Sequence, residues 1–126
     1  MTILVGYTHT PEGSAALRHG METASTTGKS LAIFPLSEDP VDAGNQDAEL
    51  TDALSDGARL VQRDPQGRHP AEELIDMVQE SDAELVVIGV RNRSRMSKIL
   101  LGSDAQSIIL GSPVPVLTVK AASNER

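Results

Sequence analysis

The chain has 126 residues, no cysteine, only two aromatic side chains and a formal net charge of −7. This length predicts one domain with a hydrophobic core, and the lack of cysteine excludes disulfides and thiolate metal sites. Nucleic acid is disfavoured as a partner, because a polyanion requires a basic face and unpaired bases require aromatic platforms. No apolar run approaches the ~20 residues that cross a bilayer, so we expect a cytoplasmic protein without membrane contact.

Five apolar runs of strand length follow one another at the spacing of one strand plus one helix. They occupy residues 3–7, 31–36, 59–61, 85–88 and 114–119. Between them, helical periodicity predicts helices over residues 11–24 and 70–80, each with a proline at its first position. A shorter and weakly marked helix is predicted near residues 47–56.

A fourth helix is predicted to begin at Ser103. The Ser-Asp-Ala-Gln sequence at 103–106 has the form of a capping box, with Ser103 as the N-cap residue. Gly28, Gly57 and Gly111 follow candidate helices and are predicted to end them.

Strands that alternate with helices predict an α/β fold. We expect a single Rossmann-like three-layer domain over residues 1–126, in which helices cover both faces of a five-stranded, mostly parallel sheet. Residues 121–126 are predicted to form a frayed polar tail. Ligands of such sheets bind beyond the carboxyl ends of the strands, near the point where the strand order reverses. The loops at residues 8–10 and 89–102 are therefore the predicted binding region.

The second of these loops is basic in an otherwise acidic chain. Four cations fall between Arg91 and Lys98, and the loop runs from a buried strand and Gly89 to Gly102 and a helix start. Free N–H groups and the helix dipole at a helix N-terminus both favour anions, so this segment predicts a phosphate site. A solvated loop that balances the acidic surface explains the charges equally well, and each glycine also has a structural interpretation.

The order of residues in this loop resembles the universal stress protein family. Gly89, two residues, Asn92, nine residues and then Gly102-Ser103 precede a helix and a Pro-Val-Pro-Val-Leu strand. The similarity extends over nearly the whole chain, including the first strand with its Thr-Pro-Glu continuation and the fourth strand that ends at Gly89. Many members of that family bind ATP and form homodimers through the last strand. The resemblance therefore implies the same ligand and the same assembly.

The resemblance also implies roles for individual residues. Gly89 would let the backbone approach the ribose and phosphates, Gly102 and Ser103 would donate hydrogen bonds to the phosphates, and Gly6 and Thr8 would lie against the base and ribose. Ser103 is explained as well by a helix cap as by a phosphate contact. The candidate nucleotide-binding residues are Gly6, Thr8, Gly89, Arg91, Asn92, Arg93, Gly102, Ser103 and Asp104.

Two of these positions depart from the family pattern. Asn92 stands where the pattern has a second glycine, and Asn tolerates positive φ well enough to keep a turn there. Thr8 stands where the family commonly has an aspartate, and a neutral hydroxyl cannot replace a carboxylate's charge-assisted hydrogen bonds. Lower affinity or a changed nucleotide preference is the expected result.

The last strand, from Val114 to Lys120, is predicted to lie at an edge of the sheet, because a central strand would not accept its prolines. A valine-rich edge invites pairing with a second copy of the chain. The resemblance favours such a homodimer over a monomer whose edge is guarded by the prolines.

We interpret the chain as a small stress-response or signalling protein that binds ATP at residues 89–103, with Mg²⁺ carried on the phosphates, and acts through an unknown protein partner. The alternative is a homodimeric interaction module of the same fold that binds no nucleotide. No nucleophile motif or acid–base pair is evident, so we expect no catalysis beyond slow ATP hydrolysis. The histidines form no metal motif, and the Gly-Lys-Ser triplet at 28–30 precedes a strand, so we interpret it as a helix stop and not a phosphate loop.

Overall fold

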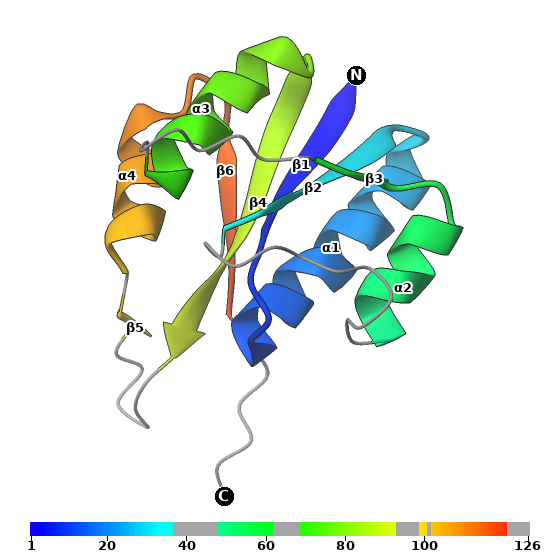
Figure 1. Cartoon of the computed structure of the whole chain (residues 1–126), viewed down its shortest axis with the longest axis horizontal. Helices are drawn as coiled ribbons and strands as arrows, with labels where there is room; N and C mark the ends of the chain where they lie inside the picture. The colour runs from blue at the N-terminus through cyan, green and yellow to red at the C-terminus, as the bar shows by residue number, and fades with distance from the viewer. Residues whose placement is uncertain (37–47, 62–68, 93–98, 101, 121–126) are drawn as a thin grey trace, which may run out of the picture.

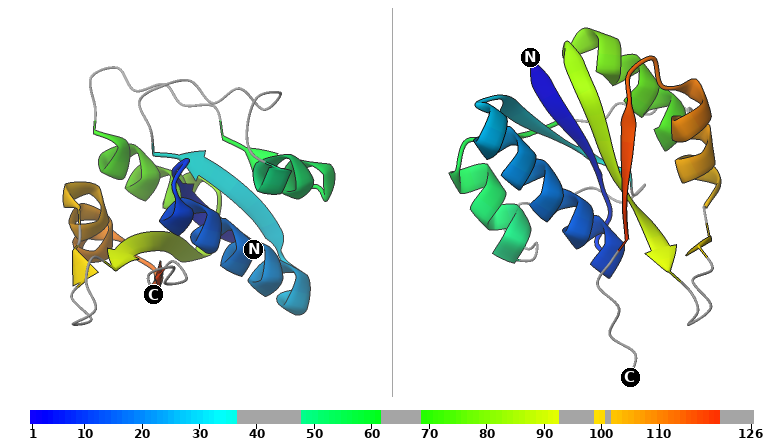
Figure 2. Two further views of the ribbon diagram at one scale, coloured as in Figure 1. Left: turned by 90° about the horizontal axis from the view of Figure 1, so that it is seen from below. Right: turned by 180° about the vertical axis from the view of Figure 1, so that it is seen from behind.

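The computed structural model describes residues 1–36, 48–61, 69–92, 99–100 and 102–120. In this part of the chain, strands and helices alternate, and the helices lie on the two sides of a central sheet (Figure 1, Figure 2). Helices α1 and α2 pack on one face of the sheet, and α3 and α4 pack on the other. The predicted three-layer α/β architecture is confirmed.

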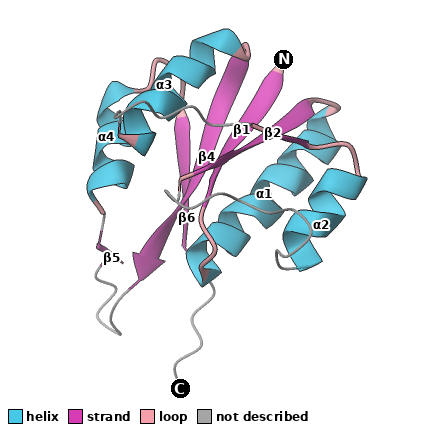
Figure 3. Cartoon of the chain, in the orientation of Figure 1, coloured by secondary structure: helices cyan, strands magenta, loops and turns pink. Residues whose placement is uncertain are grey.

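The sheet contains five parallel strands in the order β3, β2, β1, β4, β6 (Figure 3). The strands are β1 (Thr2–Tyr7), β2 (Ser30–Pro35), β3 (Arg59–Leu60), β4 (Ala83–Asn92), β5 (Ile99–Leu100) and β6 (Val116–Lys120). The short β5 runs antiparallel to the end of β4. The chain first builds outward from β1 to β3 and then crosses to the other side of β1. The strand order therefore reverses between β1 and β4.

Local signals set the ends of the helices. The helices are α1 (Pro11–Thr27), α2 (Ala48–Ser55), α3 (Pro70–Glu80) and α4 (Ser103–Gly111). Pro11 and Pro70 occupy first-turn positions, where the missing N–H costs nothing. Gly28 ends α1 with a left-handed backbone at φ 71°, so its predicted role as a helix stop is confirmed. None of the described helices is long and apolar enough to span a membrane.

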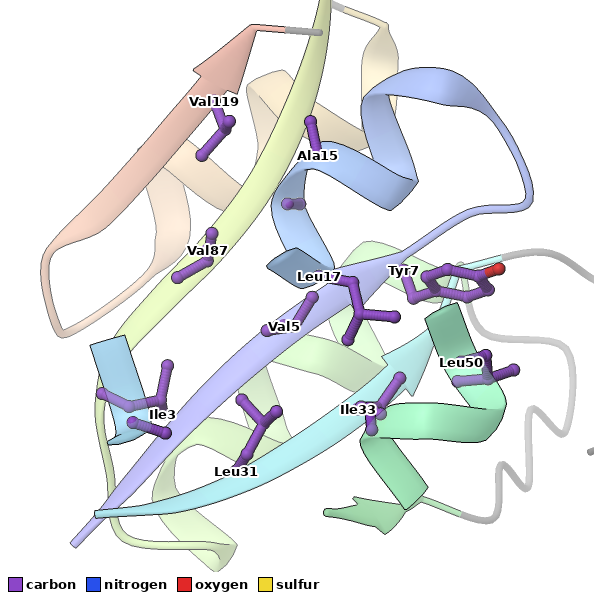
Figure 4. Close-up of a cluster of buried hydrophobic side chains, with 13 residues drawn as sticks. Ile3, Val5, Tyr7, Ala15, Leu17, Leu31, Ile33, Leu50, Val87 and Val119 are labelled. Atoms are coloured by element: carbon purple, nitrogen blue, oxygen red, sulfur yellow. The ribbon is translucent and has the colours of Figure 1, made fainter. Parts of the chain in front are cut away.

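Two hydrophobic clusters lie on opposite faces of the sheet because strand side chains alternate in direction. Ile3, Val5 and Val87 point toward α1 and α2, where Leu17 and Leu50 cover them (Figure 4). On the other face, a second cluster packs under α3 and α4, and it contains Leu4, Phe34, Leu74, Val86, Ile88 and Ile108. Strands buried on both faces are continuous apolar runs, which is why they were evident in the sequence.

Four details differ from the sequence predictions. The N-cap of α4 is Gly102 and not Ser103, because the extended Gly102 already accepts the Gln106 N–H at 3.0 Å and closes the first turn. Gly111 is the last residue of α4 and does not follow it, since Ser112 is the C-cap. The last strand begins at Val116, two residues later than predicted, and the two-residue β5 was not predicted at all.

The prolines of the last strand lie just before it. Pro115 still contributes its carbonyl oxygen, which accepts the Val86 N–H at 3.0 Å, but it has no N–H to donate. In the described residues β6 pairs with β4 alone, so the predicted edge position is confirmed. The predicted tail at residues 121–126 lies outside the described residues.

Candidate functional site

A cavity of about 490 Å³ opens at the carboxyl ends of β1 and β4, where the strand order reverses. This is the place at which parallel α/β sheets bind ligands. Its walls come from the start of α1, the end of β2, the second half of β4 and the first turns of α4. The lining residues are Thr8, Glu12, Leu36, Ile88, Gly89, Val90, Gly102, Asp104, Ala105 and Ile108.

The wall at the start of α1 is held by contacts within the chain. Thr8 Oγ1 lies 2.7 Å from Thr10 Oγ1, and Thr10 Oγ1 accepts the Gly13 N–H at 3.1 Å as the helix N-cap. A Cβ atom on Gly13 would lie 1.8 Å from the Thr8 carbonyl oxygen. The turn is therefore tight, and the Thr8 hydroxyl at the cavity wall already has a partner.

Gly89 has a structural reason to be glycine. It lies inside β4, which continues to Asn92 and so past Gly89, where the strand was predicted to end. A Cβ atom at this position would lie 2.0 Å from the Glu12 carbonyl oxygen. The backbone of β4 thus passes directly beneath the first turn of α1, and any side chain at residue 89 would push the helix away.

The wall at the start of α4 is built differently. Gly102 is the N-cap of α4 and makes no side-chain capping hydrogen bond, because glycine has no side chain. Among the described residues, nothing lies within 4 Å of a Cβ atom built on Gly102, and both Gly102 and Ser103 are exposed. The helix N-terminus, with its partial positive charge, therefore lies at the wall of the cavity.

The structure places the other candidate residues in three different situations. Gly6 lies in β1, where a Cβ atom would meet Leu36, Ile88 and Leu74 side chains at 3.0–3.2 Å, so it is a packing position behind the cavity. Arg91 and Asn92 continue β4 and pair with β5. Arg93 lies outside the described residues.

The prediction that Asn92 keeps a turn is wrong. Asn92 is the last residue of β4 and pairs with Ile99 in an antiparallel ladder, which requires an extended backbone and not a positive φ. Among the described non-glycine residues, only Asp82 has a positive φ. The second glycine of the family pattern is therefore replaced here by a strand residue.

Six lining residues are not among the candidate residues named from the sequence, although Val90 lies within the predicted binding region at 89–102. They are Glu12, Leu36, Ile88, Val90, Ala105 and Ile108. Ile88 and Val90 lie on either side of Gly89 in β4, and in a strand such residues point to the same face of the sheet. Once β4 is known to extend to Asn92, strand periodicity places both side chains on one face. Glu12 is in the first helical turn after Thr8, and its proximity to β4 is not visible in the sequence.

The described lining residues carry negative charge. Glu12 and Asp104 lie on opposite walls, and the described lining contains no lysine, arginine or histidine. His9 is exposed and does not line the cavity; its Nδ1 lies 3.5 Å from the Tyr7 hydroxyl. Across the described residues, no three His, Cys, Asp or Glu side chains are grouped to hold a metal ion. A polyphosphate would therefore meet two carboxylates as well as the α4 N-terminus.

The chain is similar to known proteins along nearly its whole length. A model of the universal stress protein family matches residues 1–120. A universal stress protein from Mycolicibacterium smegmatis is 38% identical, and the match covers 94% of this chain and 96% of that protein.

Solved structures share the fold. A universal stress protein in complex with cAMP superposes with a TM-score of 0.68 at 23% identity, covering 97% of this chain and 98% of that chain. The universal stress protein from Archaeoglobus fulgidus in complex with dAMP gives a TM-score of 0.58 at 22% identity, covering 94% and 96%. Together with the family model and the relative from Mycolicibacterium smegmatis, this similarity shows that the chain belongs to the universal stress protein family.

Proposed function

We propose that this chain is a single-domain, cytoplasmic stress-response protein that binds an adenine nucleotide, ATP, in the cavity between β1, β4 and α4. The observation that carries the proposal is the α4 N-terminus, which faces the cavity behind an exposed Gly102 with no side-chain cap. Backbone N–H groups in this situation are suited to phosphate oxygens. Two proteins of the same fold were solved with cAMP and dAMP, which supports an adenine nucleotide.

In this proposal the two ends of the cavity bind different parts of the ligand. The phosphates lie at Gly102 and Ser103, near the helix N-terminus, and the base lies against the apolar side chains of Leu36 and Ile88. We propose that Arg91, Asn92 and Arg93 also contribute to phosphate binding, because two of them are basic. Gly6 supports the wall from behind through its packing contacts.

Mg²⁺ fits the charge of the site. Asp104 lies in the first turn of α4 and lines the cavity, so phosphate oxygens bound there would lie close to a carboxylate. Mg²⁺ on the phosphates offsets this repulsion, since it prefers phosphate and carboxylate oxygens and keeps several waters. We therefore expect ATP to bind with Mg²⁺, whereas a monophosphate needs it less.

The proposal is tested by calorimetry on protein stripped of small molecules, with ATP and Mg²⁺ as ligand. The decisive variant is Gly102→Thr, because glycine and threonine are similar as N-caps and an added Cβ atom meets no described residue within 4 Å. We expect unchanged folding and at least about tenfold weaker binding, from loss of the backbone contacts to phosphate. Ser107→Thr is the matched control, since Ser107 is exposed on the same helix and outside the cavity lining.

Two results would contradict the proposal. One is a wild-type protein that binds no adenine nucleotide at millimolar concentration. The other is a Gly102→Thr variant that binds as tightly as the wild type, which would place the ligand elsewhere.

We further propose that the protein is a homodimer through β6 (Val116–Lys120). This strand pairs only with β4 among the described residues, and Leu117 on it is 37% exposed. The dimer is common to the nucleotide-binding proposal and to its alternative, an interaction module that binds no nucleotide. Light scattering on Leu117→Lys should show a monomer, whereas Ile109→Lys, at a residue of α4 with the same 37% exposure, should leave the dimer intact. A wild-type monomer at micromolar concentration would exclude the dimer.

A further inference from the structure

We propose that Glu12 accepts hydrogen bonds from the ribose hydroxyls of the bound nucleotide and makes the site selective for ribonucleotides. The inference rests on the proposed nucleotide site and adds a residue that the sequence reasoning did not include. It concerns one side chain in the first turn of α1, on the wall opposite α4.

Close contacts around the first turn of α1 set the position of Glu12. The Glu12 carbonyl oxygen lies only 2.0 Å from the position that a Cβ atom on Gly89 would take. The backbone of Glu12 therefore packs directly on β4. On the other side, Thr10 caps the helix through the Gly13 N–H at 3.1 Å, and Gly13 itself lies against the Thr8 carbonyl. A side chain held on such a rigid turn is well placed to select a ligand group, because little ordering is needed when the ligand binds.

The order of the cavity walls places the sugar at Glu12. Leu36 follows β2, Thr8 follows β1, and Gly89 is in β4, so these residues succeed one another across the sheet. The α4 N-terminus lies beyond β4 and takes the phosphates in the proposed function. The ribose connects base and phosphates, so it occupies the middle of the cavity, beside Thr8 and Glu12.

The chemistry of the two middle residues is unequal. The Thr8 hydroxyl is shared with Thr10 Oγ1 at 2.7 Å and is neutral, so it gives at most a weak contact to the sugar. The Glu12 carboxylate has two oxygens, and each can accept more than one hydrogen bond, so it can accept from ribose hydroxyls in addition to its contact within the protein. Hydrogen bonds to a carboxylate are roughly twice as strong as those between neutral groups.

The test compares AMP with 2′-deoxy-AMP, 3′-deoxy-AMP and IMP on the wild type, Glu12→Gln, Glu12→Ala and Glu22→Gln by calorimetry. AMP keeps the phosphate charge low, and IMP carries a carbonyl oxygen and a protonated ring nitrogen where the base of AMP has its amino group and an acceptor nitrogen. Glu22→Gln is the matched control, because Glu22 is an exposed glutamate on the same helix and does not line this cavity. Melting temperatures of all four proteins monitor folding separately from binding.

We expect the wild type and Glu22→Gln to bind AMP about tenfold or more tightly than at least one deoxy ligand. In Glu12→Gln the preference should fall to about threefold, and in Glu12→Ala the ligands should bind almost equally, because the hydroxyl has lost its charged acceptor. The loss of affinity from removing a ribose hydroxyl and the loss from substituting Glu12 should not add, since either change breaks the same hydrogen bond.

The inference is overturned if the wild type does not distinguish AMP from either deoxy ligand, or if Glu12→Ala keeps the wild-type preference. It is also overturned if the Glu12 variants lose discrimination against IMP instead, since the carboxylate would then bind the base amine. In all three cases AMP still binds, so the proposed function survives. If the wild type bound no nucleotide at all, the proposed function and the inference about Glu12 would both be contradicted.

Discussion

Two walls of the cavity each contain the N-terminus of a helix, but the two N-termini are capped in opposite ways. At α1, Thr10 caps the first turn, and the backbones of Thr8, Glu12, Gly13 and Gly89 lie so close that no extra atom fits. At α4, Gly102 provides no side-chain cap, and a Cβ atom there would meet none of the described residues within 4 Å. A helix N-terminus therefore holds the fold together on one side, and on the other it leaves its donors available to a ligand.

The glycines of the two walls should respond most differently to substitution. Gly89→Ala places a Cβ atom 2.0 Å from a backbone oxygen, which can only be relieved by moving α1. We expect a loss of about 3 kcal/mol or more in the free energy of unfolding, measured with denaturant. Gly102→Ala should lose about 1 kcal/mol or less, through weaker capping alone. Equal losses at the two positions would mean that the α1 wall is not closed as described.

The negative charge of Asp104 on the α4 wall should make ATP binding depend on Mg²⁺. Chelating Mg²⁺ should weaken ATP binding about tenfold through repulsion from Asp104, and should affect AMP much less. Asp104→Asn should bind ATP with less dependence on Mg²⁺, measured by calorimetry with and without chelator. A metal-independent wild type would show that Asp104 does not face the phosphates.

The cap of the α1 wall should have a measurable effect on stability. Thr10→Ala removes the acceptor of the Gly13 N–H and should lower the free energy of unfolding by about 1 kcal/mol, whereas Thr10→Ser should retain most of it. His69 is the control, because it is the N-cap of α3 and its side chain makes no capping hydrogen bond. His69→Ala is expected to change stability by less than about 0.5 kcal/mol in the same denaturation experiment. If both changes cost the same, the Thr10 contact is not a stabilising cap.

The smallest effect is expected where a cap is added to the α4 wall. Gly102→Asn supplies the missing acceptor and should stabilise the protein by a few tenths of a kcal/mol, measured by thermal unfolding. The same variant should bind nucleotide more weakly, because its side chain occupies the helix N–H groups that the phosphates need. Tighter nucleotide binding by Gly102→Asn would contradict the assignment of phosphates to this wall.

Much of the fold was predictable because its signals are local. The runs at β1, β2 and β4 are continuous and apolar, since both faces of each strand are covered, and Pro11, Gly28 and Pro70 have few alternatives to helix ends. Signals from one or two residues were less reliable. Ser103 lies one position after the true N-cap, and the two-residue β5 has no periodicity to detect.

The site was predictable in outline only. Thr8, Gly89, Gly102 and Asp104 line the cavity, which follows from their positions after parallel strands or at a helix start. Glu12 and Leu36 line it as well, but nothing in their sequence neighbourhood separates them from other helix and loop residues. Asn92 was misinterpreted because the extension of β4 depends on its pairing with β5, a contact between separate segments.

The sequence alone determined the class of the fold, the ends of its main helices and the edge of the sheet at which a ligand would bind. These properties depend on periodicity and turn chemistry, which act over a few residues. Only the tertiary structure decided that Gly89 lies beneath α1 while Gly102 is open, and that Glu12 and Asp104 face the same cavity. Those facts depend on distances between strands and helices that are far apart in the chain, and no local pattern encodes them.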